Sequence, residues 1–242
     1  EVKDLKKQLL GEDKLEHFVG IWVNRNAKRK RPNDVLNSWK IFLDNLEKEK
    51  GHRKAILIMH TDPYDQEGPN LLSTTECLGI EENVVFSQDR IDFAQMNSLY
   101  NISDFCINIS YAEGFGLGTL EAMMTGTPII ATKTGGMTRQ VIDHRDGTEN
   151  GVGLDVEIKT MVGSQGVPYI YEDYVSCDTV AAGIMKLHNL SNEEKKKLSN
   201  KVKNYAHTQF NYDEMIDLWH NSLIDLHENW KKNYKRWEKI TI

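Results

Sequence analysis

Two glutamates eight residues apart flank a glycine-rich stretch, Glu113-Gly-Phe-Gly-Leu-Gly-Thr-Leu-Glu121. The stretch follows a short apolar run at 105–108, which predicts a buried β-strand. A glycine-rich turn between a strand and a helix lets backbone N–H groups approach a phosphate or sugar oxygen at the helix N-terminus. We therefore expect Glu113 at the mouth of a ligand site and Glu121 about one helical turn into the helix.

The same stretch also fits a purely structural turn, in which Glu113 complements the helix dipole and Glu121 is solvated. It matches the dinucleotide-binding fingerprint poorly, because Thr119 stands where the third glycine is required and the next strand ends in Thr132-Lys133 rather than an acid. A P-loop is absent as well. The glycines alone favour the structural turn, so further residues have to decide.

A second group of polar residues follows the first predicted strand, in the basic run from Asn24 to Pro32. The chain as a whole is acidic, with 30 Lys and Arg against 36 Asp and Glu. A basic run at the carboxyl end of a strand places positive charge where the ligand cleft of an open sheet lies. A solvated loop or a nucleic-acid patch is the alternative, and the absence of interleaved aromatic residues disfavours nucleic acid. The basic run therefore predicts a local anion site. The choice of Arg25 and Lys30 as its ligands, with Lys28, Arg29 and Arg31 facing solvent, is implied only by the family resemblance given below.

Short apolar runs alternate with amphipathic segments from residue 17 to 156, which is typical of strand-helix units and a parallel sheet. The expected strands are His17–Val23, Ala55–Met59, Val84–Ser87, Phe105–Asn108, Pro128–Thr132 and Gly151–Val156. The expected helices are Asp34–Lys48, Asn70–Leu78, Phe93–Tyr100, Gly118–Thr125, Met137–Ile142, Thr179–Leu187, Asn192–Gln209 and Asp213–Glu238. Residues Glu157–Tyr174, with Gly163, Gly166 and Pro168, predict an irregular insertion. The predicted fold class is α/β, a Rossmann-like doubly wound parallel sheet followed by C-terminal helices.

The glutamate pair resembles the E-x7-E signature of retaining glycosyltransferases with the GT-B fold, particularly family 4. The resemblance extends over roughly forty residues. Gly126-Thr-Pro128-Ile-Ile-Ala-Thr is similar to the family's G-x-P-V-I-A-S segment, and Gly135-Gly136 to its following turn. Leu99-Tyr100 through Asp104 resembles its LY-x-x-A-D helix end, with Ser103 in place of alanine. Asn24-Arg25 through Lys30-Arg31 resembles its G-R-x4-K-G segment.

The resemblance implies a role for each matching residue. Glu113 would hold the transferred sugar and stabilise positive charge as its bond breaks, while Glu121 would accept hydrogen bonds from the nucleotide ribose. Arg25 and Lys30 would bind the donor diphosphate and act in catalysis with Glu113. The base would rest near Ser87, Arg90 and Ile91, and the remaining donor contacts would come from Gly114, Phe115, Gly116, Leu117, Thr134 and Gly135. Many relatives carry an acid after the Gly-Gly turn, whereas this chain continues Met137-Thr-Arg-Gln140.

We expect three segments. Residues 1–14 form an N-terminal linker or helix, 15–210 the nucleotide-sugar-binding domain, and 211–242 a C-terminal helix that crosses to a separate acceptor-binding domain missing from this chain. That helix carries Trp219, Leu223, Leu226 and Trp230 on one stripe. Its aromatic and basic end, through Trp237, offers peripheral membrane contact as an alternative.

The expected partners are a UDP- or GDP-sugar and an acceptor glycan or lipid, with no nucleic acid. No cofactor and no metal are expected, because Lys30, Arg25 and the helix N-terminus can offset diphosphate charge. The three cysteines are far apart and the eight histidines form no metal-ligand pattern. A cytoplasmic location is expected, since no signal peptide or membrane span is evident. The predicted activity is a glycosyltransferase of hexosyltransferase type. A non-catalytic nucleotide-sugar-binding module and a related epimerase or phosphorylase are the alternatives.

Overall fold

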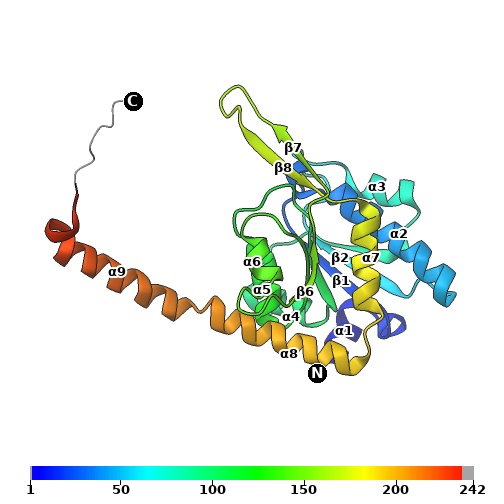
Figure 1. The fold of residues 1–242 in the computed structure, drawn as a ribbon. Coiled ribbons are helices and arrows are strands. Elements are labelled where there is room, and N and C mark those ends of the chain that lie inside the picture. The colour runs from blue at the N-terminus through cyan, green and yellow to red at the C-terminus, as the bar shows by residue number, and fades with distance from the viewer. Residues whose placement is uncertain (1, 236–242) are drawn as a thin grey trace.

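A computed structural model describes residues 2–235 and contains a six-stranded sheet in which all paired neighbours are parallel (Figure 1). The strand order is β3-β2-β1-β4-β5-β6. The strands are β1 (Phe18–Val23), β2 (Ala55–His60), β3 (Val84–Ser87), β4 (Phe105–Asn108), β5 (Ile129–Thr132) and β6 (Gly151–Leu154). The parallel sheet and its six predicted strands are confirmed, with ends that differ by two residues at most.

Helices cover both faces of this sheet, which makes the fold doubly wound. One face carries α2 (Pro32–Lys50), α3 (Leu71–Leu78) and α7 (Cys177–His188), whose apolar side chains join one core cluster. The other carries α4 (Phe93–Asn101), α5 (Leu117–Thr125), α6 (Met137–Val141) and α8 (Asn192–Gln209), which join a second cluster. Short 3-10 turns occupy Glu12–Lys14, Lys28–Lys30 and Glu81–Asn83. The predicted Rossmann-like α/β class is confirmed.

The two core clusters explain why the central strands are apolar at consecutive positions. In β1, Val19 and Ile21 belong to one cluster while Phe18 and Trp22 belong to the other, and all four are buried. Successive side chains of a strand point to opposite faces, so helices on both faces bury every position. The carboxyl ends of these rigid strands therefore hold the loops that follow them in fixed places.

The prediction of an irregular insertion at 157–174 is wrong. Two antiparallel strands, β7 (Ile158–Val162) and β8 (Ile170–Tyr174), form a hairpin that extends beyond the sheet (Figure 1). The two glycines and the proline that suggest an irregular segment, Gly163, Gly166 and Pro168, all lie in the loop that connects the two strands. The strands themselves have few buried side chains, so they lack the apolar pattern by which a strand is recognised.

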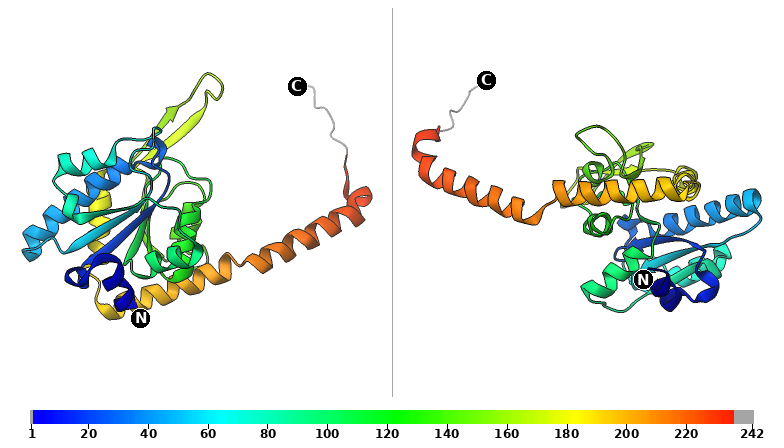
Figure 2. Two further views of the ribbon diagram at one scale, coloured as in Figure 1. Left: turned by 180° about the vertical axis from the view of Figure 1, so that it is seen from behind. Right: turned by 90° about the horizontal axis from the view of Figure 1, so that it is seen from below.

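The C-terminal helix α9 (Tyr212–Asn233) extends away from the rest of the molecule (Figure 2). It has no buried residues, and the stripe of Trp219, Leu223, Leu226 and Trp230 is exposed. The predicted helix continued to Glu238, but Arg236, Trp237 and Glu238 lie outside the described residues. At the other end, α1 (Val2–Leu10) packs Leu5 and Leu10 against the second cluster.

Candidate functional site

The site forms where the strand order of the sheet reverses. From β1 the chain proceeds to β2 and β3 on one side, whereas β4 is followed by β5 and β6 on the other. The connections that leave β1 and β4 therefore diverge and open a crevice at the carboxyl ends of these two strands, where open α/β sheets bind ligands. The basic run follows β1 and the glutamate-glycine stretch follows β4, so the topology brings the two predicted motifs together.

Lys30 and Glu113 form an ion pair in this crevice, with the Lys30 ammonium donating to Glu113 Oε2. Their side chains are only 9% and 13% exposed, and Arg29 Nη1 lies 3.9 Å from the same carboxylate oxygen. Desolvation of a nearly buried pair costs free energy, and removal of one partner strongly destabilises the fold because the other charge is left unpaired. The pair therefore marks a place where two opposite charges are held side by side at the edge of the sheet.

The glycine loop, residues 114–118, packs backbone against backbone on the turn that follows β5. The Gly136 N–H donates to the carbonyl oxygens of Glu113 (3.3 Å) and Gly114 (3.2 Å). A Cβ atom at Gly135 would lie 2.0 Å from Glu113 O, and one at Gly136 would lie 2.5 Å from Gly114 O. Both positions therefore require glycine, and this close approach fixes the backbone that carries Glu113.

The first turn of α5 presents free backbone donors beside this loop. Gly116 has φ +86°, a conformation that suits glycine, and α5 begins at Leu117. The first N–H groups of a helix have no partner within it and carry partial positive charge. The Phe115 and Leu117 side chains are exposed, while Thr134, in the turn after β5, is buried. The predicted contacts Gly114, Phe115, Gly116, Leu117, Thr134 and Gly135 thus lie on two adjoining turns.

Arg25 is not brought together with the Lys30–Glu113 pair. Its guanidinium makes two hydrogen bonds to the Asp65 carboxylate, at 2.7 and 3.1 Å, and lies 3.9 Å from Glu67. The Arg25 side chain is 63% exposed, and its hydrogen bond lowers the pKa of Asp65. In this arrangement Arg25 binds an acid of its own chain, so a role in diphosphate binding requires it to exchange that partner.

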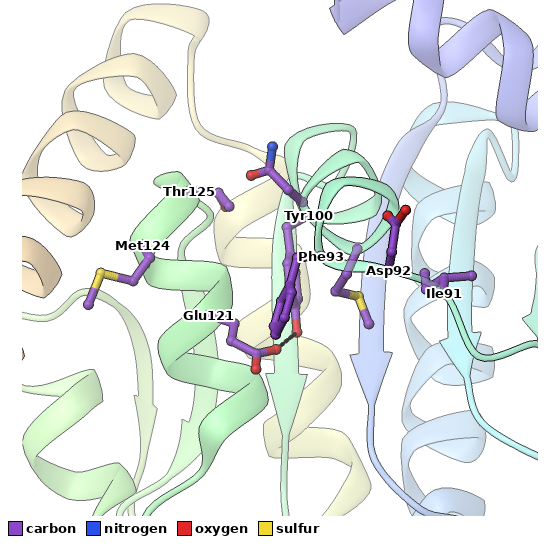
Figure 3. Close-up of a pocket in the computed structure, with 9 residues that line it drawn as sticks. Ile91, Asp92, Phe93, Tyr100, Glu121, Met124 and Thr125 are labelled. Atoms are coloured by element: carbon purple, nitrogen blue, oxygen red, sulfur yellow. Dashed lines mark hydrogen bonds between the residues drawn. The ribbon is translucent and has the colours of Figure 1, made fainter. Parts of the chain in front are cut away.

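Glu121 lines a neighbouring pocket of about 420 Å³ between α4 and α5 (Figure 3). Tyr100 donates a hydrogen bond of 2.9 Å to Glu121 Oε2, and burial raises the pKa of this phenol, which keeps it a donor. The pocket is largely apolar, with Ile91, Phe93 and Met124 among its walls. An exposed carboxylate at the rim of an apolar slot can accept hydrogen bonds from a hydroxylated ring that enters it.

Of the three residues predicted to lie near a base, the structure places Ile91 in the pocket with Glu121. Ser87 ends β3, where its hydroxyl and His60 Nδ1 share a hydrogen bond of 2.9 Å. Burial lowers the pKa of His60, so the neutral imidazole is favoured. Arg90 is exposed in the loop between β3 and α4. Ser87 and Arg90 do not line the pocket that Ile91 and Glu121 share.

The prediction that Arg31 faces solvent is wrong, whereas Lys28 and Arg29 are exposed as expected. Arg31 is buried, donates to Val175 O (2.8 Å) and Asp34 Oδ2 (2.7 Å), and lies 5.0 Å from the centre of the Tyr111 ring. It is also the one non-glycine residue with positive φ, +56°, among residues 2–235. The only sequence signal was Asp34 three residues later, because the other partners are remote in the chain.

Gln140 stands where many relatives carry an acid. Its side chain is fully buried beneath the glycine loop and contacts the loop carbonyls rather than the crevice.

Among residues 2–235, no three histidine, cysteine or acidic side chains come together as a metal-binding group. No helix within that range has the length and apolar character to span a membrane.

Comparison with known proteins identifies the family. Residues 19–158, which include the crevice, match the model of the glycosyl transferases group 1 family. The chain belongs to this family. A D-inositol 3-phosphate glycosyltransferase of Segniliparus rotundus is 35% identical over 138 residues, which are 57% of this chain and 29% of that protein.

Solved structures of the same fold agree. Anabaena HepE in complex with UDP-glucose has a TM-score of 0.69 at 17% identity and covers 93% of this chain and 52% of its own. The C-terminal domain of a glycosyl transferase group 1 protein, LpcC of Francisella tularensis, has a TM-score of 0.58 at 18% identity and covers 81% and 87%. The chain therefore spans less than a third of the curated relative and about half of HepE, yet most of an isolated C-terminal domain.

Proposed function

We propose that this chain is the donor-binding part of a retaining glycosyltransferase, which moves a sugar from a UDP- or GDP-sugar to a hydroxyl of an acceptor glycan or lipid. The observation that carries the proposal is the nearly buried Lys30–Glu113 pair at the crevice between β1 and β4, beside the free N–H groups of α5. Membership of the group 1 family supports it. HepE, which shares the fold, is described with bound UDP-glucose.

The nucleoside would occupy the pocket between α4 and α5. Its ribose hydroxyls would donate to the Glu121 carboxylate, which also accepts a hydrogen bond of 2.9 Å from the Tyr100 hydroxyl. Ile91 would contact the base from the pocket wall, since an apolar wall suits the face of an aromatic ring. The diphosphate would then extend along the start of α5 toward Lys30, where the helix N-terminus favours negative charge.

The reaction would proceed at the Lys30–Glu113 pair. The bond between the anomeric carbon and the phosphate oxygen breaks, and its electron pair goes to the departing diphosphate, whose charge Lys30 and the helix N-terminus offset. Glu113 would hold the sugar hydroxyls and stabilise the positive charge that develops on the sugar ring. The acceptor oxygen forms the new bond on the face that the diphosphate leaves, and its proton passes to the departing phosphate. No metal is required in this scheme, because the protein supplies the positive charge.

Isothermal titration of the chain with UDP, GDP and their sugar conjugates, in the presence of EDTA, tests this proposal. We expect saturable binding of one nucleotide, weakened about tenfold or more by Lys30→Met, because a charge-assisted contact is lost. Lys28→Met is the matched control, since Lys28 lies on the same short 3-10 turn but is exposed. Arg25→Ala reports whether Arg25 leaves Asp65 for the diphosphate.

Absence of binding by the folded wild-type chain would contradict the donor-site proposal. Equal loss in the Lys28 and Lys30 variants would instead indicate a general charge effect rather than the crevice. Nucleotide release is measured next, in a protein that includes an acceptor-binding domain. Binding without turnover there would favour the non-catalytic binding module.

A further inference from the structure

Gln140 is the fourth of the five residues of α6, directly beneath the glycine loop, and its side chain is fully buried. Its carboxamide nitrogen donates to Phe115 O (2.7 Å) and Gly116 O (3.2 Å), and its oxygen accepts from the Thr119 hydroxyl (2.5 Å). Asn150 also donates to the Gln140 backbone carbonyl (2.9 Å). The carboxamide thus uses both of its N–H groups and its oxygen on the loop and the first turn of α5.

These hydrogen bonds fix the direction of two peptide groups. In a trans peptide, the carbonyl of one residue and the N–H of the next point in opposite directions. Gln140 holds the Phe115 carbonyl toward the protein interior, and it shares the Gly116 carbonyl with the Thr119 hydroxyl (2.8 Å) and the Leu120 N–H (3.2 Å). The N–H groups of Gly116 and Leu117 are therefore directed to the other side of the loop, toward the crevice. Gly116 has φ +86°, so rotation of this backbone has a low steric barrier unless a partner restrains it.

We propose that Gln140 is a positioning residue for diphosphate recognition, which aims the Gly116 and Leu117 N–H groups into the crevice without touching the ligand. This inference rests on the proposed donor site. Many relatives carry an acid at this position, so the two N–H contacts that Gln140 donates are particular to this chain. An ionised acid there would face two carbonyl oxygens with no proton to donate.

Two variants separate this role from simple packing. Gln140→Met has a similar volume but no N–H donor, and we expect nucleotide affinity to fall about tenfold, as for the loss of two neutral hydrogen bonds. Gln140→Glu keeps the size and one acceptor oxygen. Burial raises the pKa of a carboxyl in such a place, so the glutamate gains a proton as pH falls and can then donate to Phe115 O.

The expected signature is a pH rescue. Gln140→Glu should bind nucleotide at least as weakly as Gln140→Met at pH 8, and should recover several-fold relative to wild type by pH 5, whereas Gln140→Met should show no recovery. In the ligand-free chain, NMR order parameters of the Gly116 and Leu117 amides should fall in Gln140→Met and remain unchanged in the β7–β8 hairpin.

Wild-type order parameters and wild-type affinity in Gln140→Met would overturn the proposal. So would a Gln140→Glu profile that parallels the wild type at every pH. If either variant fails to fold, Thr119→Val removes the hydroxyl that contacts both Gln140 Oε1 (2.5 Å) and Gly116 O (2.8 Å), and loss of about threefold in affinity with a wild-type melting temperature is expected. Unchanged affinity in Thr119→Val would then count against the proposal. Failure of the wild-type chain to bind nucleotide refutes the donor site instead, while the order parameters still test Gln140.

Discussion

The glycine loop and the β7–β8 hairpin both lie at the carboxyl edge of the sheet, yet they are held in opposite ways. The loop is fixed along its length by backbone contacts to Gly135 and Gly136 and by the buried Gln140 side chain. The hairpin is fixed only at its base, and the ends of its strands away from the base are exposed, with Met161 of β7 59% accessible. A segment held along its whole length is suited to orient a small charged group, whereas one held at its base can adjust to a larger partner.

The base of the hairpin is nevertheless joined directly to the residues beside the ion pair. The Asp173 N–H donates to Tyr111 O (2.9 Å), and the Tyr111 N–H donates to Arg29 O (3.0 Å). Arg31 lies against the Tyr111 and Tyr174 rings, at 5.0 and 5.6 Å from their centres. The two regions therefore share an anchor next to Lys30 and Glu113, and the comparison predicts that they respond differently to substitution.

Addition of one methyl group to the loop should have the largest effect. In Gly136→Ala the new Cβ would lie 2.5 Å from Gly114 O and 2.8 Å from Phe115 Cα, so the backbone has to move. We expect the free energy of unfolding to fall by about 2–3 kcal/mol and nucleotide affinity to fall at least about tenfold, measured by urea denaturation and calorimetry. Gly166→Ala in the hairpin loop meets no atom within 4 Å and should change stability by less than about 0.5 kcal/mol. Equal losses of stability in Gly136→Ala and Gly166→Ala would contradict the view that the glycine loop is held more tightly than the hairpin.

Substitution of Arg31 should loosen the hairpin and spare the loop. Arg31→Ala removes the contacts to Val175 O, Asp34 and the two rings, with an expected loss of about 2 kcal/mol in unfolding free energy. Arg31→Gly removes the same contacts but accepts φ +56° without strain, so it should be more stable than Arg31→Ala by about 0.5–1 kcal/mol. Hydrogen exchange should accelerate in β7 and β8. Hydrogen exchange that accelerates evenly over the whole sheet would contradict the role of Arg31 as an anchor of the hairpin.

A smaller effect is expected from Asp143, which follows α6, the helix that carries Gln140. The two hydrogen bonds from the Arg145 guanidinium lower the pKa of Asp143 to about 2. A carboxyl with a depressed pKa stabilises the fold fully above its unfolded pKa, near 3.9, and this contribution is lost as pH falls toward 2. Urea denaturation of Asp143→Asn between pH 6 and 2 should show a lower plateau and a shallower fall at acid pH than the wild type. Parallel curves would rule out this ion pair as a source of acid sensitivity.

The sheet and the position of the crevice could be predicted because they depend on local pattern. Consecutive apolar residues identify strands buried on both faces, and the carboxyl ends of β1 and β4 must then adjoin once the strand order reverses. Lys30 and Glu113 could be assigned to one site from the strand ends and the family resemblance, although 83 residues separate them, whereas the strand order that makes β1 and β4 neighbours comes from the structure.

The partners of individual side chains could not be predicted in this way. Arg25 pairs with Asp65, forty residues away, and Arg31 reaches Val175, 144 residues away. These contacts depend on where loops return in space, which local periodicity does not encode. The hairpin could not be predicted because neither of its faces is buried, so its strands do not need the alternation of apolar residues by which a strand is recognised. Gln140 gave no signal because a buried glutamine that binds backbone looks like any polar residue in a short helix.

The most direct test of the donor site is an amide chemical-shift map of the ¹⁵N-labelled chain titrated with UDP and with GDP. One nucleotide is expected to shift the amides of Gly114, Phe115, Gly116 and Leu117 together with those of Ile91 and Glu121, while the tip of the β7–β8 hairpin and α9 remain unchanged. Shifts confined to other surfaces, with the glycine loop unmoved at saturation, would contradict the assignment of the crevice between β1 and β4 as the nucleotide-sugar site.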